Sequence, residues 1–433
     1  MTNKKIITFS IILILIFISF ILLSKIQIKF EDFKNQIKSK DLKIKKLNQR
    51  ISSIEKAKNL SNKEIFPNTQ FAEFKFEEFK IPFKKEGFEN YTANSGKTNP
   101  FYISSYEDKI FIISKNSEIF FLDLKNNNKI KSITNNLNAK NVYDTLIFDN
   151  DIYVVVSQYD KSIKKNNNIS GLSCKHYFSR KILKSKINFS NLKFEEFYNE
   201  KICWDTSGKE NGGRVEIYYD KISGPNMLLS VYDYIKDEKN VLKLNDGATK
   251  YISINMKTKE VKDYAYGFRN PQGLLVLNKN VIISSEHGPR GGDEINRIYY
   301  NNNYGWPISS YGEKYNEGYN SDEKYYYKKS HKKFNFIEPI YAFVPSIGIS
   351  QIIEVKKEFL DKWKNNILIS SLRNRSLYRV VFDDNYERLI SMERIHIGKR
   401  IRDISYNEYQ NAFLLALENS PATLGIIKVK NKD

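Results

Sequence analysis

Short runs of β-branched and aromatic residues, separated by turn residues, recur from about residue 108 to the end of the chain. These runs are Ile110–Ser114, Glu118–Leu124, Ile152–Ser157, Val281–Ser285, Ile367–Ser370, Ser376–Phe382 and Phe413–Leu417. Helical periodicity is nearly absent over this stretch. Repeated short strands build sandwiches, barrels or propellers, and roughly three hundred residues of them favour a propeller. The pattern therefore predicts an all-β propeller, and by itself it leaves the number of blades open.

The composition supports a large core and does not single out a nucleic-acid partner. Hydrophobic residues make up 41% of the chain and aromatic residues 14%, which is ample material for a core packed from strands. The 70 Lys and Arg against 50 Asp and Glu give a net charge of +20, which can attract nucleic acid or anionic lipid. The excess is mostly lysine scattered among Asn and Ile, as in Lys161–Asn168. We therefore expect a solvated basic surface and no nucleic-acid partner.

Two cysteines, Cys174 and Cys203, are present in the whole chain. Their separation suits one disulfide if this part of the protein lies in an oxidising compartment. Two unrelated buried thiols are the alternative reading. The four histidines are far apart in sequence, so no Cys/His spacing typical of a metal site exists.

The segment Ile6–Ser24 carries no charge and is long enough to cross a membrane as a helix. Lys4 and Lys5 precede it, which favours a cytoplasmic N-terminus at residues 1–5. A cleaved signal peptide is the alternative, but no small-residue cleavage site follows the apolar run. We expect a single-pass protein of the bacterial inner membrane, with its bulk on the periplasmic side.

Residues 25–58 carry apolar side chains at alternating steps of three and four, with Lys40 in the one polar position of that register. The apolar residues are Phe30, Phe33, Ile37, Ile44, Leu47, Ile51 and Ile54. Such spacing over about four heptads predicts a coiled-coil stalk that would join copies of the chain, and a single amphipathic helix is the alternative. Residues 59–107 contain Pro67, Pro82 and Pro100 and are expected to form a linker leading into a propeller at 108–433.

One long motif, from Gly267 to Pro307, reads GFRNPQGLLVLNKNVIISSEHGPRGGDEINRIYYNNNYGWP. It closely resembles the signature of the glucose/sorbosone dehydrogenase family. Shorter matches follow the same family: GGRVEIYYD at Gly212–Asp220, LLSVYD at Leu228–Asp233, FVPSIGIS at Phe343–Ser350, SLRNRSLYRV at Ser371–Val380 and RIRDI at Arg400–Ile404. The resemblance implies a six-bladed β-propeller that holds pyrroloquinoline quinone (PQQ) and calcium.

The cations in these motifs suit a cofactor of this kind. PQQ is a planar quinone with three carboxylates, and guanidinium groups bind carboxylates bidentately and stack on planar rings. By resemblance Arg269 and Asn270 line the cofactor, and Arg373 stands where the family often has lysine. Arg400 and Arg402 are further candidate cofactor-binding residues.

The resemblance also implies two calcium sites. Calcium prefers hard oxygen ligands, including backbone carbonyls. In the family, the cofactor-bound calcium is held by carbonyls that match Gly288 and Pro289, and a second, structural calcium would involve Glu294 and Tyr304. The alternative is that the glycines of this segment only form a tight loop.

The catalytic base departs from the family pattern. Sugar-oxidising members have a histidine four residues before the Arg of the GGR motif, and it takes the proton from the sugar hydroxyl. Here Glu210 stands at that distance before Arg214. A carboxylate can act as a general base when its pKa is tuned toward the working pH, so we expect Glu210 to take this role. Asp233 aligns with an acidic residue near the family's active site.

Two functions follow as hypotheses. The first is a membrane-anchored, PQQ- and calcium-dependent dehydrogenase that oxidises an aldose sugar or an alcohol outside the cytoplasm and passes electrons to a respiratory acceptor. The second is a catalytically silent propeller that binds a glycan or a protein partner at the same face, since fold does not determine function. An enzyme would keep convergent arginines around the cofactor, whereas a binding module would fill or neutralise that site.

Overall fold

The structure is a computed structural model of the chain. It describes residues 72–84, 98–160, 178–201, 212–231, 249–313 and 327–430, together with part of 23–48. The chain divides into two compact units, Met1–Ile65 and Phe66–Asp433.

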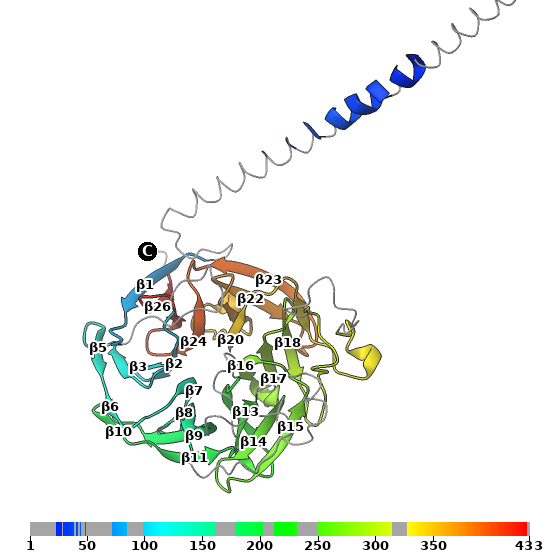
Figure 1. Cartoon of the computed structure of the whole chain (residues 1–433). Coiled ribbons are helices and arrows are strands. Elements are labelled where there is room, and N and C mark those ends of the chain that lie inside the picture. The colour runs from blue at the N-terminus through cyan, green and yellow to red at the C-terminus, as the bar shows by residue number, and fades with distance from the viewer. Residues whose placement is uncertain are drawn as a thin grey trace, which may run out of the picture. The chain divides into compact units, whose positions relative to one another are not determined.

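Among the described residues of the second unit, the strands form six four-stranded antiparallel sheets arranged around a centre (Figure 1). Blade 1 consists of β2 (Phe101–Tyr106), β3 (Lys109–Ser114), β4 (Ile119–Asp123) and β5 (Lys129–Ser132). Blade 2 consists of β7 (Asn141–Phe148), β8 (Asp151–Tyr159), β9 (Phe178–Lys186) and β11 (Glu195–Asn199). Blade 3 consists of β12 (Val215–Asp220), β13 (Gly224–Val231), β14 (Lys250–Asn255) and β15 (Val261–Tyr266).

The remaining blades follow in chain order. Blade 4 consists of β16 (Pro271–Val276), β17 (Ile282–Glu286), β18 (Asp293–Ile298) and β19 (Tyr341–Phe343). Blade 5 consists of β20 (Ile349–Glu354), β21 (Ile367–Ser371), β22 (Ser376–Phe382) and β23 (Leu389–His396). Blade 6 consists of β24 (Ile401–Asn407), β25 (Ala412–Leu417), β26 (Thr423–Val429) and the N-terminal strand β1 (Phe74–Lys80). The described residues thus confirm the six-bladed all-β propeller.

Smaller elements connect the blades. A two-stranded parallel pair joins β6 (Thr134–Asn135) to β10 (Asn191–Leu192) between blades 1 and 2. Single 3-10 turns, η1 (Asn278–Asn280), η2 (Lys332–Phe334) and η3 (Asp361–Trp363), lie in the loops of blades 4 and 5.

The ring closes through strand pairing within blade 6. Strand β1 pairs antiparallel with β26, from Phe74 opposite Val429 to Lys80 opposite Thr423, so the two ends of the propeller share one sheet. Strands β1 and β2 both precede residue 108, and the propeller therefore begins earlier in the chain than the strand pattern indicates. In β1 the sequence FKFEEFK places Phe74 and Phe76 on one face, against a cluster of blades 5 and 6, and Phe79 on the other, against the cluster of blades 1 and 6.

The core consists of apolar clusters between neighbouring blades. One cluster joins blades 1 and 6 and includes Phe101, Ile112 and Leu414. Another joins blades 4 and 5 and includes Ile283 and Ile369. Each fully buried side chain of this size contributes roughly 1.5–3 kcal/mol, so stability is distributed around the ring.

The first unit requires a correction to the sequence-based expectations. Its described residues lie between positions 23 and 48, are helical and exposed, and include charged side chains such as the Glu31–Lys34 ion pair. Among the residues that the structure describes, no helix has both the length and the apolar character needed to cross a membrane. This finding overturns the expectation of a single-pass inner-membrane protein with a periplasmic propeller.

The other N-terminal expectations fall largely on undescribed positions. Most of Ile6–Ser24 lies outside the described residues, and the predicted coiled coil at 25–58 is described only in part, so it stays a prediction. Cys174 and Cys203 also lie outside the described residues.

Candidate functional site

Irregularities in the ladders mark one end of the inner strands. In β7, β16, β20 and β24 the pairing register shifts near the start of the strand. The residues bypassed by the pairing are Tyr143 in β7, Gln272 in β16, Ser350 and Gln351 in β20, and Arg402 in β24. A bulge of this kind frees backbone groups from the ladder and redirects a side chain, and bulges are common beside functional sites.

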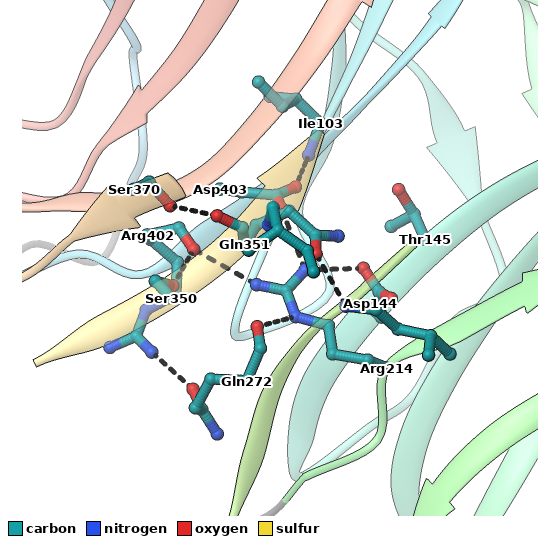
Figure 2. Close-up of polar contacts among 12 residues, drawn as sticks. Ile103, Asp144, Thr145, Arg214, Gln272, Ser350, Gln351, Ser370, Arg402 and Asp403 are labelled. Atoms are coloured by element: carbon teal, nitrogen blue, oxygen red, sulfur yellow. Dashed lines mark hydrogen bonds and ion pairs between the residues drawn. The ribbon is translucent and has the colours of Figure 1, made fainter. Parts of the chain in front are cut away.

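Arg214 lies where four blades meet (Figure 2). Its Nη1 donates to Asp144 Oδ1 at 2.9 Å and to Asp403 Oδ1 at 2.8 Å. Its Nε donates to the carbonyl of Gln272 at 2.6 Å, and its Nη2 to the carbonyl of Arg402 at 3.1 Å. The arginine immediately precedes β12, so this one side chain links blade 3 to blades 2, 4 and 6.

The two carboxylates beside Arg214 are tied to the backbone as well. Asp144 Oδ2 accepts the Val215 N–H at 2.9 Å, and Asp403 Oδ2 accepts the Ile103 N–H at 3.0 Å. The side chains of Arg214, Asp144 and Asp403 are only 2%, 3% and 3% exposed. Burial raises the pKa of Asp144 to about 6, although Arg214 acts in the opposite direction. Buried charges of this kind need their partners, because an unpaired one is strongly destabilising.

A second charged group lies at the start of β24. Arg400 Nε donates to Glu418 Oε1 and Arg402 Nε donates to Glu418 Oε2, each at 2.7 Å. The Glu418 side chain is 1% exposed, whereas the two arginines are 18% and 17% exposed. Burial alone would raise the pKa of Glu418, but Arg402 and Arg400 lower it below its usual value. One buried carboxylate thus holds two guanidinium groups whose side chains are mostly buried.

Gln272 connects this group to the long motif. Its Oε1 accepts a hydrogen bond from Arg402 Nη1 at 3.2 Å, and its Nε2 donates to Asn270 Oδ1 at 2.9 Å. The buried Asn270 also accepts the Gly212 N–H at 3.2 Å, so it joins the GGR segment to blade 4. Residues of three separate motifs therefore form one polar network.

Arg269 is held against the loop that follows β17. Its Nη1 donates to the carbonyls of His287 and Gly288 at 3.1 and 3.0 Å. The guanidinium carbon lies 5.4 Å from the ring centroid of Trp306, a cation–π distance. The predicted cofactor residues Arg269 and Asn270 are thus brought together with Gly288.

The loop itself can be formed only by glycines at its closest approaches. A Cβ on Gly288 would collide with the carbonyls of Gly291 and Gly292, and Gly292 also has a φ of +68°. The neighbouring strand segment is fixed by Arg290 and Glu313, which exchange backbone hydrogen bonds at 2.7 and 2.9 Å. The glycines therefore have a structural role in the tight loop, and this role is compatible with exposing the carbonyls of the same loop to a ligand.

Two buried carboxylates face each other behind this loop. Glu286 and Glu294 are paired across β17 and β18, and they line a cavity of about 10 Å³ together with Tyr304 and His331. This is about the space of a single water or ion. Burial, and then the neighbouring Glu294, raise the pKa of Glu286 well above its usual value. His331 Nδ1 bonds the Tyr304 carbonyl at 2.7 Å and its Nε2 lies 3.5 Å from Glu294 Oε1.

Other predicted residues are not joined to this network. Arg373 is exposed at the turn after β21, and within the described part of the chain only its backbone is bonded, to Ile347 at 3.1 Å. Glu210 and Asp233 lie outside the described residues. Sequence reasoning missed Glu418, Asp144 and Asp403. Two of the unpredicted residues were signalled by motifs: Gln272 lies in the long motif and Asp403 in the RIRDI segment, whereas no motif marked Glu418 or Asp144.

Comparisons with known proteins agree with the family resemblance that the motifs indicate. The family model described as Glucose / Sorbosone dehydrogenase matches residues 240–424. The aldose sugar dehydrogenase YliI of Escherichia coli is 28% identical over 210 residues, which are 48% of this chain and 52% of that protein. The quinoprotein glucose dehydrogenase B of Acinetobacter calcoaceticus is 26% identical over 175 residues, which are 28% of this chain and 35% of that protein. The chain thus spans about half or less of the length of these relatives.

A solved structure shares the architecture over most of the propeller. The PQQ-bound form of an aldose sugar dehydrogenase from Streptomyces coelicolor is 15% identical, covers 82% of this chain and 99% of its own, and has a TM-score of 0.55. At this identity the likeness speaks for the fold. Together with the match at 240–424, it confirms the resemblance of this chain to the glucose/sorbosone dehydrogenase family.

Proposed function

We propose that the protein is a PQQ-dependent dehydrogenase that oxidises an aldose sugar or an alcohol. The observation that carries this proposal is the polar network from Arg400 and Arg402 through Gln272 to Asn270, which unites residues of separate family motifs. Relatives named as aldose sugar and quinoprotein glucose dehydrogenases support it.

The residues present fit the cofactor. PQQ needs cations for its carboxylates and a surface for its planar ring. Glu418 accepts hydrogen bonds from the Nε atoms of Arg400 and Arg402. Among the described residues, the terminal nitrogens of these two arginines make one hydrogen bond, from Arg402 Nη1 to Gln272. Arg269 and the exposed Arg373 would supply further positive charge.

Calcium is part of the proposal. The carbonyls of Gly288 and Pro289 would hold the ion beside the cofactor, and Glu294 with the Tyr304 carbonyl would hold a second one. Each carbonyl oxygen has two lone pairs. The Gly288 carbonyl uses one for Arg269 and the Tyr304 carbonyl uses one for His331, so each keeps a second lone pair for an ion. The pKa of Glu286 is raised because its carboxyl group is buried beside Glu294, and a calcium ion nearby would stabilise the negative charge of these carboxylates.

The chemistry follows from these assignments. PQQ, when bound, supplies an acceptor for the hydride that leaves the carbon bearing the substrate hydroxyl. In the proposal, Glu210 takes the hydroxyl proton and Asp233 lies near it. Arg400, Arg402 and Arg269 would hold the anionic cofactor and would stabilise negative charge on it. Gln272 bonds both Arg402 and Asn270 and so fixes the guanidinium of Arg402 relative to Asn270.

The test is a titration of the purified full chain with PQQ and Ca²⁺, followed by dye-linked oxidation of a panel of aldoses and alcohols. Saturable PQQ binding with turnover is expected. Glu210→Gln should bind PQQ but lose turnover by roughly 100-fold or more, the usual contribution of a general base. The matched control, Glu195→Gln, alters an exposed carboxylate on an outer strand and should behave as wild type. Absence of PQQ binding by the wild type would refute the enzyme and leave a propeller that binds a glycan or a protein.

Calcium has its own measurement. Adding Ca²⁺ to chelator-treated protein should raise the melting temperature, because a ligand that binds the folded state stabilises it. Glu294→Gln should weaken this response, and Glu260→Gln, whose side chain is exposed, should leave it unchanged. An equal response in both variants would exclude Glu294 as a calcium ligand.

A further inference from the structure

Two backbone carbonyls at the centre of the propeller are released from their ladders. The pairing of β16 with β17 passes over Gln272, and the pairing of β24 with β25 passes over Arg402. Buried carbonyls that leave a ladder need another donor. Arg214 supplies one to each, at 2.6 Å for Gln272 and 3.1 Å for Arg402, and Ser350 Oγ supplies a second to the Arg402 carbonyl at 2.5 Å.

The side chains of these two bulged residues meet in the candidate site. Arg402 Nη1 donates to Gln272 Oε1, and Gln272 continues the network to Asn270. Arg214 bonds their carbonyls while their side chains bond each other, as Figure 2 shows. The same bulges thus give Arg214 its acceptors and give the candidate site its polar side chains.

The geometry requires a guanidinium. Arg214 serves two carboxylates and two carbonyls at once from a planar group with donors in fixed directions. A lysine ammonium has three donors and no fixed plane, so it cannot satisfy all four acceptors. Asp144 and Asp403, each also fixed to a backbone N–H, hold the guanidinium in this orientation.

We propose that Arg214 is a positioning residue for the cofactor site. It holds the bulges at Gln272 and Arg402 and thereby sets the direction of the two side chains that would contact the bound quinone. The role in cofactor binding rests on the proposed function, whereas the holding of the two bulges does not.

Arg214→Lys tests the proposal, with Arg379→Lys as its matched control. Arg379 is also a largely buried arginine, bonded to Glu393 at 2.8 Å and Asn366 at 2.7 Å, but it lies in β22, the third strand of blade 5. Both variants should lose some thermal stability. Hydrogen–deuterium exchange of the ligand-free protein should become faster at 271–276 and 401–407 in Arg214→Lys only, and the dissociation constant for PQQ should rise roughly tenfold or more in that variant only.

A second variant covers the case in which Arg214→Lys fails to fold. Asp144→Asn keeps Arg214 but removes one charge that orients it, and it should produce smaller changes of the same kind. The proposal is overturned if exchange at 271–276 and 401–407 is no faster in either variant than in Arg379→Lys. It is also overturned in its cofactor part if the affinity for PQQ is the same in all variants. A wild type that binds no PQQ refutes the proposed function, and the exchange data then still decide whether Arg214 holds the bulges.

Discussion

Glu418 and Arg402 form a 2.7 Å hydrogen-bonded ion pair at the centre-facing end of blade 6, with the second oxygen of the same carboxylate bound to a neighbouring arginine. A fully buried anion thus fixes two cations whose side chains are largely buried. An anionic cofactor would meet guanidinium groups whose orientation is already set, which lowers the entropic cost of binding.

Replacing the Glu418 carboxylate should show how much this ion-paired group contributes to the free energy of unfolding. We expect Glu418→Gln to lower the free energy of unfolding by about 3 kcal/mol at pH 7, because it leaves two largely buried guanidinium groups without their counter-charge. The pKa of Glu418 is lowered in the folded state, so its stabilisation is present above the ordinary pKa of 4.5 and is lost as the pH falls through the lowered value. Urea unfolding of wild type and variant at pH 7 and pH 3 measures this, and a difference that does not shrink in acid would contradict it.

Gln272→Met separates binding from stability. It removes the side-chain hydrogen bonds that join Gln272 to Arg402 and to Asn270 while preserving the size and flexibility of the side chain, so Arg402 loses its link to Asn270. The affinity for PQQ is expected to fall about tenfold, with a change in unfolding free energy of about 1 kcal/mol. Gln158→Met, which removes a surface bond to the Asn138 carbonyl, is the control. Equal affinities for PQQ would show that the bridge does not orient Arg402.

Glu216, in the inner strand β12, should respond to pH in the opposite sense. Burial raises its pKa from 4.5 to about 7. The folded state therefore keeps the proton that the unfolded chain releases, and the carboxyl destabilises the fold progressively as the pH rises from 4.5 to 7. Glu216→Gln should be more stable than wild type at pH 8 by about 1–3 kcal/mol and equal to it near pH 4.5. Thermal unfolding across this range is the measurement, with the exposed Glu260→Gln as a control that should track wild type at every pH.

Phe74 tests the closure of the ring. It begins β1, is 3% exposed, and lies with its ring 5.3 Å from Trp363 and 5.8 Å from Phe359. Phe74→Ala should lower the free energy of unfolding by about 3–5 kcal/mol, the range for large-to-small changes of aromatic core residues. Ile222→Ala, at a side chain that is 98% exposed, should have almost no effect. A small loss for Phe74→Ala would mean that β1 contributes little to closing the propeller.

Some of these features could be predicted from local sequence. Runs such as Phe413–Leu417 and Ile367–Ser370 were predicted as strands and lie in β25 and β21, because β propensity and short turns act over a few residues. The strand β1 was not predicted, because its three phenylalanines do not alternate regularly with polar residues and prolines stand nearby in the sequence. Its partner β26 lies more than three hundred residues away in the chain, and no local pattern indicates that pairing.

The sequence by itself determined a β-propeller with the glucose/sorbosone dehydrogenase signature, and it singled out Arg269, Asn270 and the arginines at 400 and 402 as candidate cofactor-binding residues, because these lie in motifs that are continuous along the chain. Only the tertiary structure decided that Glu418 holds both of those arginines, and that Arg214 with its two aspartates supports the bulges beside them. The reason is physical. A buried charge is stable only where its partners converge on it. Glu418 meets its two arginines through the pairing of β24 with β25, and Arg214 meets its partners only where blades 2, 3, 4 and 6 come together.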